Sequence, residues 1–423
     1  MSTMKIAIIS SGYLPVVDGV TVALDQRLRS LSQQGHRVLL LCPDYQPIAP
    51  VYPHWREYVG EIYPGVQVMA LPSEPFMGIE FERNLSRQAA APLRQALRDF
   101  HPDLIHVDEP ERIFLGLLKY PGIEVARGDR LPCTAFFHTN FLDYIEDFVP
   151  LPAPLVGSLQ WGSKQIIRRV FNAYDATLVA SEVAHQRIRQ MGIRNGVGDR
   201  FLGIDLAQFQ AQARLPQFFS QHYGIAGLEE KTKVVFLGRL TPDKGWRFTL
   251  DALTALVRQP QWENLRPTVS LIIAGDGELR EEILRILGQL GIETHWLGRV
   301  PPTAVPPLLV NCDLHVTTST KETLGLTVLE AFAAGIPAIA PRAGGVVTTI
   351  QDGWNGFLFE PQSKQDFLEK LLKLIQNSNL RREMGDRARR DAAQYGQDAA
   401  MERLLAVWQA QIDRCRPQPA SRS

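Results

Sequence analysis

Cysteine is scarce in this chain of 423 residues. The four cysteines, Cys42, Cys133, Cys312 and Cys415, stand far apart and form no close pairs. A disulfide scaffold or a zinc site needs cysteines at short, regular spacings, so the sequence favours neither. We therefore expect a protein of a reducing, cytoplasmic compartment, with no structural metal.

Long apolar runs and an excess of one charge are also missing. No stretch approaches the roughly 18 apolar residues of a membrane-spanning helix, and the start, MSTMKIAIISSGYLP, is too polar for a signal peptide. The 45 Lys and Arg residues balance the 45 Asp and Glu residues. A neutral chain gives no reason to expect nucleic acid as a partner. We predict a protein that is neither secreted nor membrane-spanning.

The length and the pattern predict two α/β domains. A chain of 423 residues exceeds one typical core, and apolar strands alternate with amphipathic helices in both halves, as in doubly wound parallel sheets. The polar, glutamine-rich segment AQARLPQFFSQHYGIAGLEE predicts a linker at 211–230. The predicted domains are 1–210 and 231–395, and a last helix at 396–414 is expected to cross back to the first domain.

The segment 317–345, TTSTKETLGLTVLEAFAAGIPAIAPRAGG, organises the second half. It predicts a strand end, a polar loop containing Glu322, and a helix from about 327 to 334 that carries Glu330 and is closed by Gly335. The backbone N–H groups of Leu326, Thr327 and Val328 would form a helix start that attracts anions. An anion site between two carboxylates suits a nucleotide sugar, whose diphosphate joins two polyols. The simpler interpretation is a surface helix with two solvated glutamates.

This segment resembles the Glu, seven residues, Glu motif of retaining glycosyltransferases of family 4. The resemblance implies a GT-B fold, in which two Rossmann-like domains face each other across a cleft, and it implies a nucleotide-sugar donor. It places Glu322 at the hydroxyls of the donor sugar. One departure is plain: an acid usually follows the glycine pair, and this chain has Val346 to Thr349 there.

Further matches in the second half support the resemblance. GRLTPDKG holds Arg239 and Lys244, two cations five residues apart that could share one diphosphate, as the family's clamp does. Two further segments resemble family segments near the nucleotide. They are the GDGE segment, which begins at Gly275, and the segment from Gly298 to Val300.

The first half resembles the family's pattern at the ends of two predicted strands. The loop with Asp18 and Gly19 follows the first strand, lacks the dinucleotide spacing G-x-G-x-x-G, and resembles the family loop that borders the donor diphosphate. His138 follows the strand CTAFFH. A lone histidine there is usually structural, but the resemblance places one beneath the donor sugar.

Three segments of the first half go beyond that pattern. The segment 45–81, rich in Pro and aromatic residues, is expected to be an acceptor-side insertion rather than core. The segment 81–100 predicts one helix with Arg83, Arg87, Arg94 and Arg98 along it, which is usually a solvated face. The predicted helix within 151–175 carries Trp161, Lys164, Arg168 and Arg169. Such a helix suits an anionic membrane surface, or equally a core helix with a basic edge.

The acceptor prediction rests on short segments. FHTNFLDYIEDF, with His138, Asn140 and Tyr144, and HVDEPERIFLG, with Glu109, resemble segments of digalactosyldiacylglycerol synthases. This implies galactosyl transfer from UDP-galactose to monogalactosyldiacylglycerol by a peripheral membrane protein. Another lipid glycosyltransferase, such as one that transfers sulfoquinovose to diacylglycerol, is the alternative.

The resemblance also implies a chemistry. Retention is expected by front-face substitution, with Arg239 and Lys244 stabilising the leaving diphosphate and with no metal or cofactor. Double displacement with Glu322 as the nucleophile is a rival mechanism. A non-catalytic sugar-nucleotide binder is a rival function, against which the complete set of Arg239, Lys244, Glu322 and Glu330 argues.

Overall fold

The computed structural model describes residues 3–76, 79–138 and 153–415, without the side chains of 79–81 and 153–160. The chain divides into two compact units, and each is described by itself. The first unit comprises Met1–Gly203 together with Gln397–Ser423, and the second comprises Ile204–Gly396.

The first unit is built on a sheet whose strands run in the order β10-β9-β8-β7-β1-β2-β4-β3. Its central strands are apolar runs buried on both faces, as parallel strands between helices require, and only β3 is antiparallel. The strands of this unit are β1 Lys5–Ser10, β2 Arg37–Pro43, β3 Gly60–Tyr63, β4 Val66–Leu71, β5 Ser73–Phe76, β6 Ile79–Leu85, β7 Leu104–Asp108, β8 Cys133–Phe136, β9 Ala176–Val179 and β10 Gly196–Gly198.

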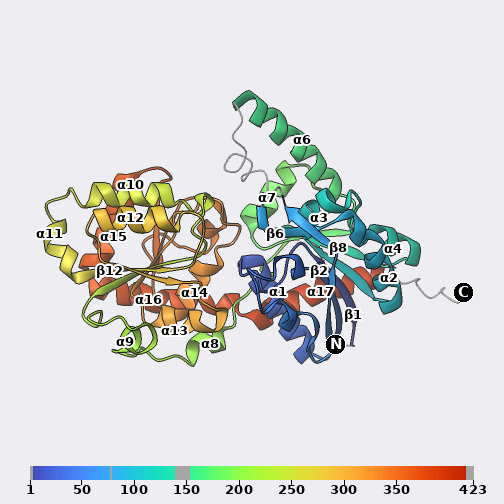
Figure 1. Ribbon diagram of the computed structural model, residues 1–423, viewed down its shortest axis with the longest axis horizontal. Coiled ribbons are helices and arrows are strands. Elements are labelled where there is room, and N and C mark those ends of the chain that lie inside the picture. Colours follow the sequence, from blue (N-terminus) through green and yellow to red (C-terminus); the bar gives the residue numbers. More distant parts are fainter. Residues whose placement is uncertain (1–2, 77–78, 139–152, 416–423) are drawn as a thin grey trace, which may run out of the picture. The chain divides into compact units, whose positions relative to one another are not determined.

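Helices cover both faces of this sheet (Figure 1). They are α1 Gly19–Gln33, α2 Ala90–Phe100, α3 Pro110–Leu117, α4 Ile123–Asp129, α6 Ala153–Phe171, α7 Glu182–Gln190 and α17 Gln397–Cys415. Helix α1 packs beside α17, and α3 packs beside α6. The last helix therefore belongs to the first unit, where Trp408 is fully buried and lies 5.0 Å from the His106 ring.

Two expectations for this unit are wrong. The segment 45–81 is not a mere insertion, because β4 pairs in parallel with β2 and buries Val66, Val68 and Leu71 in the core. The segment 81–100 is not one helix, because β6 runs to Leu85 and α2 begins only at Ala90. Arg83 lies on that strand, is buried, and donates through Nη2 to the carbonyl of Ser73 at 2.8 Å. The four arginines thus share no helical face.

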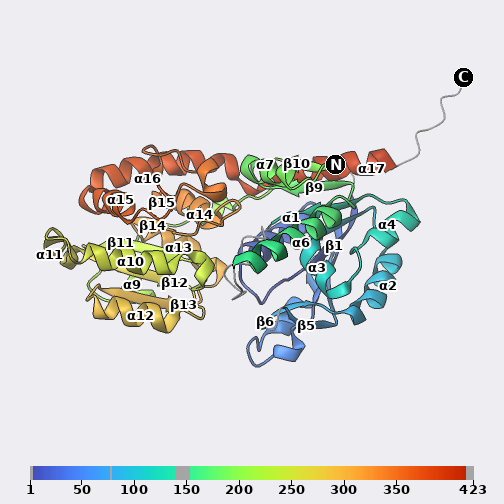
Figure 2. The ribbon, with the colours of Figure 1, turned by 90° about the horizontal axis from the view of Figure 1, so that it is seen from above.

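The second unit holds a parallel sheet in the order β13-β12-β11-β14-β15-β16, and Figure 2 shows its labelled strands following one another in that order. Its strands are β11 Thr232–Leu237, β12 Val269–Ala274, β13 Thr294–Gly298, β14 Leu314–Val316, β15 Ala338–Pro341 and β16 Gly356–Phe359. Its helices are α8 Leu206–Gln210, α9 Phe218–Tyr223, α10 Trp246–Leu256, α11 Trp262–Leu265, α12 Arg280–Gln289, α13 Val305–Val310, α14 Leu326–Ala334, α15 Lys364–Gln376 and α16 Ser378–Ala392.

The segment 211–230, expected to be a linker, is folded into the second unit. Helix α9 buries Phe218 and Phe219, and the chain passes between the units at Gly203, before that segment begins. The chain enters and leaves the second unit at one place, where the Ile204 N–H donates to the Tyr395 carbonyl at 2.9 Å. The linker was predicted from the polar composition of the segment, which does not reveal that these two phenylalanines are buried. Across the described parts of the chain, no helix combines the length and apolarity needed to cross a membrane.

Candidate active site

The loop after β14 and the start of α14 form the centre of the second unit's candidate site. Helix α14 runs from Leu326 to Ala334, which confirms the predicted helix to within one residue. Gly325 and Gly335 bound it with positive φ angles of 82° and 78°, a conformation that favours glycine. Glu322 lies in the loop and Glu330 on the helix, as the spacing predicted.

The helix start is open at two of the three expected amides. Gly325 offers no side chain as a cap, and Leu326 and Thr327 occupy the first helical positions, whose N–H groups have no partner inside a helix. The N–H of Val328 donates to the Gly325 carbonyl at 3.0 Å, so the expectation for Val328 is wrong. A ligand anion can therefore be held by Leu326 and Thr327.

Lys244 and Glu322 are joined directly. The Lys244 Nζ donates to Glu322 Oε1 at 2.7 Å, and the side chains are 25% and 21% exposed. Burial disfavours the charge on Glu322, but Lys244 and a hydrogen bond from Ser319 outweigh it and lower the pKa of the carboxyl below its ordinary value. Glu322 is thus ionised at neutral pH, with its cation still reachable from solvent.

Arg239 joins the same group of charges through Asp243. Its Nη2 lies 3.4 Å from Asp243 Oδ2, and the Arg239 side chain is 36% exposed while Asp243 is fully buried. Lys244 Nζ lies 3.8 Å from the same oxygen. One buried carboxylate therefore positions both cations of the predicted clamp, which the sequence analysis did not foresee.

Backbone contacts fix the loop that carries Lys244. The Thr318 hydroxyl donates to the carbonyls of Lys244 and Gly245 at 3.1 Å, and the Ser319 hydroxyl donates to the Asp243 carbonyl at 3.1 Å. A Cβ on Gly245 would lie 2.4 Å from the Thr318 carbonyl oxygen, so no side chain fits there. The hydroxyl-rich run after β14 thus orients the clamp.

The glycine pair after β15 supports Glu322 from the other side. The Gly345 N–H donates to the Glu322 carbonyl at 2.6 Å, and a Cβ on Gly345 would lie 1.9 Å from the Thr323 carbonyl oxygen. Val346, where the family usually has an acid nearby, is fully buried, and its side chain fills the space beside Gly325. In this chain, Val346 packs in the interior and offers no charge.

Glu330 differs from Glu322 in having no described partner. It is half-buried, and burial raises the pKa of its carboxyl to about 7. His315 is a neighbour of this loop that the sequence did not single out. It is fully buried on β14, its Nε2 lies 3.2 Å from the Thr327 hydroxyl, and burial lowers its pKa to about 4.

Gly275 and Val300 lie at the ends of the neighbouring strands β12 and β13. Gly275 has φ 150°, and a Cβ there would lie 1.8 Å from the Gly238 carbonyl oxygen, so this glycine lets two loops touch. Trp296 Nε1 donates to the Gly275 carbonyl at 2.8 Å, and the Arg280 guanidinium lies 5.0 Å from the Trp296 ring. Half-buried Val300 lies two residues after the end of β13.

In the first unit, His138 belongs to a sealed charged cluster with Asp108 and Arg27. His138 Nε2 lies 2.7 Å from Asp108 Oδ1, and Arg27 Nη1 lies 3.1 Å and 3.2 Å from the two carboxylate oxygens. All three side chains are at most 3% exposed. Burial opposes the charge of Asp108, but Arg27 and His138 hold its pKa well below the ordinary value. His138 thus lies where the sequence put it, at a strand's carboxyl end.

Two further residues of this strand edge are informative. Glu109, next to Asp108, has a positive φ of 52°, which is rare outside glycine, and accepts a hydrogen bond from the Ser11 hydroxyl. Gly19 opens α1, but the Asp18 carboxylate already accepts from the N–H groups of Val20 and Thr21. The loop at Gly19 is therefore a helix cap, and those two amides are not free for a diphosphate.

The remaining predicted residues divide into two groups. Asn140 and Tyr144 lie outside the described residues. On α6, Trp161 is 68% exposed, Lys164 is half-buried, and Arg168 and Arg169 are exposed. The helix buries Ile167 and Val170 instead, so the basic residues form its outer side.

Two models of protein families match this chain, one in each half. Residues 17–197 match the model described as "Glycosyltransferase Family 4", and residues 223–391 match "Glycosyl transferases group 1". Two glycosyltransferase family models thus match the chain in succession. Their ranges fall within the two structural units.

Several curated glycosyltransferases are similar to this chain. The sulfoquinovosyl transferase SQD2 of Arabidopsis thaliana is 28% identical over 73% of this chain and 58% of its own length, so this chain matches less than two thirds of that relative. A GDP-mannose-dependent alpha-mannosyltransferase of Corynebacterium glutamicum is 26% identical over 90% of this chain and 83% of its own length. An alpha-monoglucosyldiacylglycerol synthase of Streptococcus pneumoniae is 24% identical over 84% and 75%.

Solved structures establish the fold. Sucrose-phosphate synthase from Thermosynechococcus elongatus superposes with a TM-score of 0.76 at 18% identity, covering 97% of this chain and all of that one. The chain thus has the GT-B glycosyltransferase fold, with two Rossmann-like domains.

Proposed function

We propose that this protein is a retaining glycosyltransferase that moves a hexosyl group from a nucleotide sugar to a membrane lipid. The observation that carries the proposal is the group formed by Arg239, Lys244 and Glu322 beside the open start of α14. The matches to glycosyltransferase families indicate the class of reaction. The two cations and the helix start could stabilise the negative charge of a diphosphate leaving group.

The donor would bind first through its diphosphate. Both cations of the clamp are partly exposed, so their guanidinium and ammonium groups can turn to phosphate oxygens, with the amides of Leu326 and Thr327 adding two more donors. The carboxylates of Glu322 and Glu330 would accept hydrogen bonds from hydroxyls on either side of the phosphates. His138 is proposed to lie near the donor sugar, although its own ring is buried against Asp108.

Front-face substitution is the proposed route. The bond between the sugar's C1 and the diphosphate oxygen breaks, and the acceptor oxygen bonds to C1 from the same face. The acceptor's proton passes to the departing phosphate oxygen, so no protein nucleophile and no metal are required. The two cations hold the charge that grows on the leaving group. Because Glu322 is already bonded to Lys244, it suits an acceptor of hydroxyl hydrogen bonds better than an attacking nucleophile.

The acceptor is proposed to be a glycerolipid. The HTN and DEPE segments resemble those of digalactosyldiacylglycerol synthases, and one relative is named for a diacylglycerol product. We therefore propose transfer of galactose from UDP-galactose to monogalactosyldiacylglycerol at the cytoplasmic face of a membrane. The second candidate is sulfoquinovosyl transfer to diacylglycerol, which similarity to a sulfoquinovosyl transferase favours.

A product assay tests the proposal. The purified protein is incubated with radiolabelled UDP-galactose and micelles of monogalactosyldiacylglycerol, and in parallel with UDP-sulfoquinovose and diacylglycerol. We expect a digalactosyl lipid with an α-linkage in the first reaction. Sulfolipid from the second reaction alone would replace the galactolipid assignment. Binding of nucleotide sugars without release of free nucleotide in the presence of any lipid extract would refute the transferase and leave a binding protein.

A further inference from the structure

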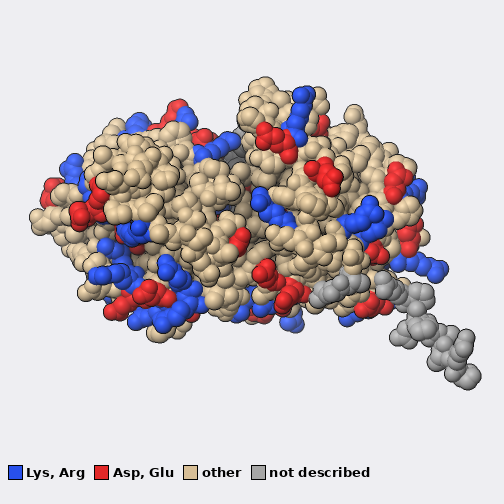
Figure 3. Space-filling model, turned by 90° about the horizontal axis from the view of Figure 1, so that it is seen from below, with Lys and Arg blue, Asp and Glu red and all other residues tan. Residues whose placement is uncertain are grey.

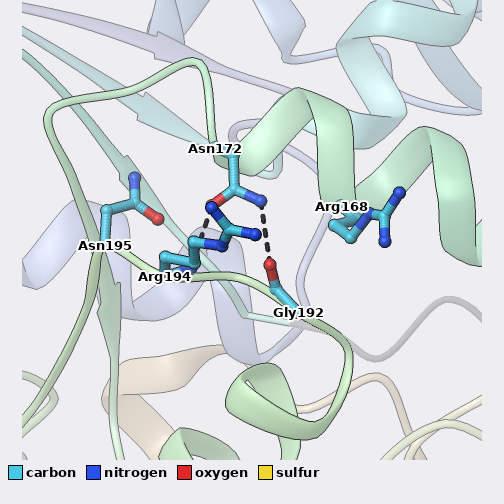
Figure 4. A pocket seen from close by; sticks show the side chains of 5 residues that line it. All are labelled: Arg168, Asn172, Gly192, Arg194 and Asn195. Atoms are coloured by element: carbon cyan, nitrogen blue, oxygen red, sulfur yellow. Dashed lines mark hydrogen bonds between the residues drawn. The ribbon is translucent and has the colours of Figure 1, made fainter.

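A second basic site lies on the first unit, at the edge of the sheet opposite to His138. Arg168, Asn172, Gly192, Arg194 and Asn195 line a solvent-open hollow of about 560 Å³ (Figure 4). The hollow lies where α6 ends and β9 and β10 begin. Because β8 and β9 run in parallel and His138 follows the carboxyl end of β8, the hollow and the candidate active-site edge are at opposite ends of the strands.

Hydrogen bonds hold the frame of this hollow. Asn172 donates through Nδ2 to the Gly192 carbonyl at 3.0 Å and accepts from the Arg194 N–H at 2.9 Å, as Figure 4 shows. Asn195 Nδ2 donates to the carbonyls of Phe171 and Tyr174 at 2.9 Å and 2.8 Å. The loop before β10 is thus fastened to the turn after α6, and its shape is set before any ligand arrives.

Because residue 192 is glycine, the aliphatic part of the Arg168 side chain can lie against its backbone. Gly192 has a positive φ of 86°, and a Cβ there would lie 2.9 Å from Arg168 Cδ. The Arg168 side chain therefore lies along the glycine backbone instead of extending freely into solvent. Arg168 thus lines the hollow.

The two arginines of the hollow have no carboxylate partner among the described residues. The nearby acid of the same turn, Asp175, is already paired with Arg127 at 2.9 Å and also accepts from the Cys133 N–H. The fixed charges at this place are therefore positive and available. Guanidinium groups are donors with which proteins bind phosphate groups.

The surface beside the hollow points to a bilayer. Trp161, Lys164 and Arg168 are spaced at three and four residues, so they share one face of α6, and Trp161 lies about 10 Å from Arg168 along the helix axis. An exposed tryptophan beside cations is typical of the interface between a membrane and water. Figure 3 shows acidic and basic side chains intermixed over one face of this neutral protein, so attraction to an anionic membrane has to come from such a local group.

We propose that this hollow binds the phosphate group of an anionic lipid headgroup and docks the first unit on the membrane. This site goes beyond the proposed transfer reaction, because it binds neither donor nor acceptor sugar. Its test uses neither, so its failure and that of the transferase assignment can be told apart.

The test is vesicle binding of the full-length protein. Vesicles of phosphatidylcholine alone are compared with vesicles that also contain phosphatidylglycerol, for the wild type and for Arg168→Gln, Arg194→Gln and Arg169→Gln. The last variant is the matched control, since Arg169 is a neighbouring exposed cation of the same helix that does not line the hollow. Thermal unfolding of each variant checks that it folds.

We expect binding only when phosphatidylglycerol is present. Each of Arg168→Gln and Arg194→Gln should weaken it by more than about fivefold, the factor typical of one basic residue at an anionic surface, because charged hydrogen bonds to the phosphate are lost as well, and Arg169→Gln by clearly less. The Lys variants at 168 and 194 should restore part of the binding. Equal losses in all three Gln variants would mean general surface charge and overturn the site. Stabilisation by inorganic phosphate without vesicle binding would overturn the lipid assignment.

Discussion

The two units hold charged side chains at the ends of their strands in opposite ways. In the first unit, Arg27 and His138 both contact the Asp108 carboxylate out of contact with water. In the second unit, Arg239, Lys244 and Glu322 are also joined, but each side chain is between 21% and 36% exposed. The first group is closed off from solvent, although Arg27 Nη2 makes no hydrogen bond there, whereas the second can exchange one ionic partner for another.

This difference separates stability from function. A sealed ion pair is costly to break, since the remaining charge has no water around it, and it contributes a fixed geometry. A partly exposed pair contributes little to stability, because water and salt screen it, but it keeps its cations ready for a diphosphate. The sealed cluster should therefore determine whether the first unit folds, and the exposed group should determine whether the donor reacts.

The largest effect is expected from breaking the sealed cluster. Arg27→Met leaves the Asp108 carboxylate buried with only the imidazoles of His106 and His138 beside it, and should lower the free energy of unfolding of the first unit by about 3–5 kcal/mol. Urea unfolding followed by hydrogen exchange, which separates the two units, measures this. The double variant Arg27→Met with Asp108→Asn should recover part of the loss. If Arg27→Met costs less than about 1 kcal/mol, the range of an exposed pair, the contrast between the units is wrong.

Glu322→Gln should have the next largest effect, and only on catalysis. The amide keeps the shape but loses the charge that holds the reacting sugar, so turnover should fall by at least about two orders of magnitude. Affinity for the nucleoside diphosphate should stay nearly unchanged, because Lys244 remains. Initial rates of product formation and calorimetric binding measure the two quantities. Glu281→Gln, at an acid of the same unit that is 89% exposed, is the control and should be indifferent. A variant with wild-type turnover would remove Glu322 from the site.

Lys244→Ala should affect binding and turnover together. Loss of one charged hydrogen bond to the diphosphate corresponds to about tenfold to a hundredfold in affinity. Stability should change little, since the pair with Glu322 is partly exposed, and this is the opposite of the result expected for Arg27. Calorimetry with the nucleoside diphosphate tests it, and Lys364→Ala, at an exposed cation of the same unit, serves as the control. Unchanged affinity in Lys244→Ala would count against the clamp.

The sequence was sufficient for features that depend on local pattern. The glycine at 335 predicted where α14 ends, and the local pattern put Glu322 in the loop and Glu330 on the helix. The apolar run before His138 likewise predicted a buried strand with the histidine at its end. Such features are fixed by neighbours in the chain, so they can be deduced without the tertiary structure.

Features that depend on distant contacts were missed. Asp243, which holds both cations, and Arg27, which neutralises Asp108 from 81 residues away, have no local signature. The strand β4 and the buried Phe218 looked like insertion and linker, because composition does not reveal which apolar residues find a core. Asp18 alone could have been foreseen, since an aspartate followed three residues later by threonine is a typical helix cap.

The smallest effect is expected from pH, through Glu330, and it distinguishes the two carboxylates of the second unit. Burial raises the pKa of Glu330 to about 7, while Lys244 keeps Glu322 ionised well below that pH. The raised pKa means that the folded protein binds the proton more tightly than the unfolded chain, so Glu330 lowers stability as pH rises through about 4.5 to 7.

The affinity for the donor should depend on pH in the opposite direction. Only the ionised carboxylate is a strong acceptor for a donor hydroxyl, so affinity should rise with pH across about 7, by at most about tenfold per pH unit. The intact nucleotide sugar is the right ligand, because its phosphates do not titrate in this range. Glu330→Gln should flatten the profile, and Glu322→Gln should leave its pH dependence in place. A profile equally steep in Glu330→Gln would assign the titration to another group and remove Glu330 from the donor site.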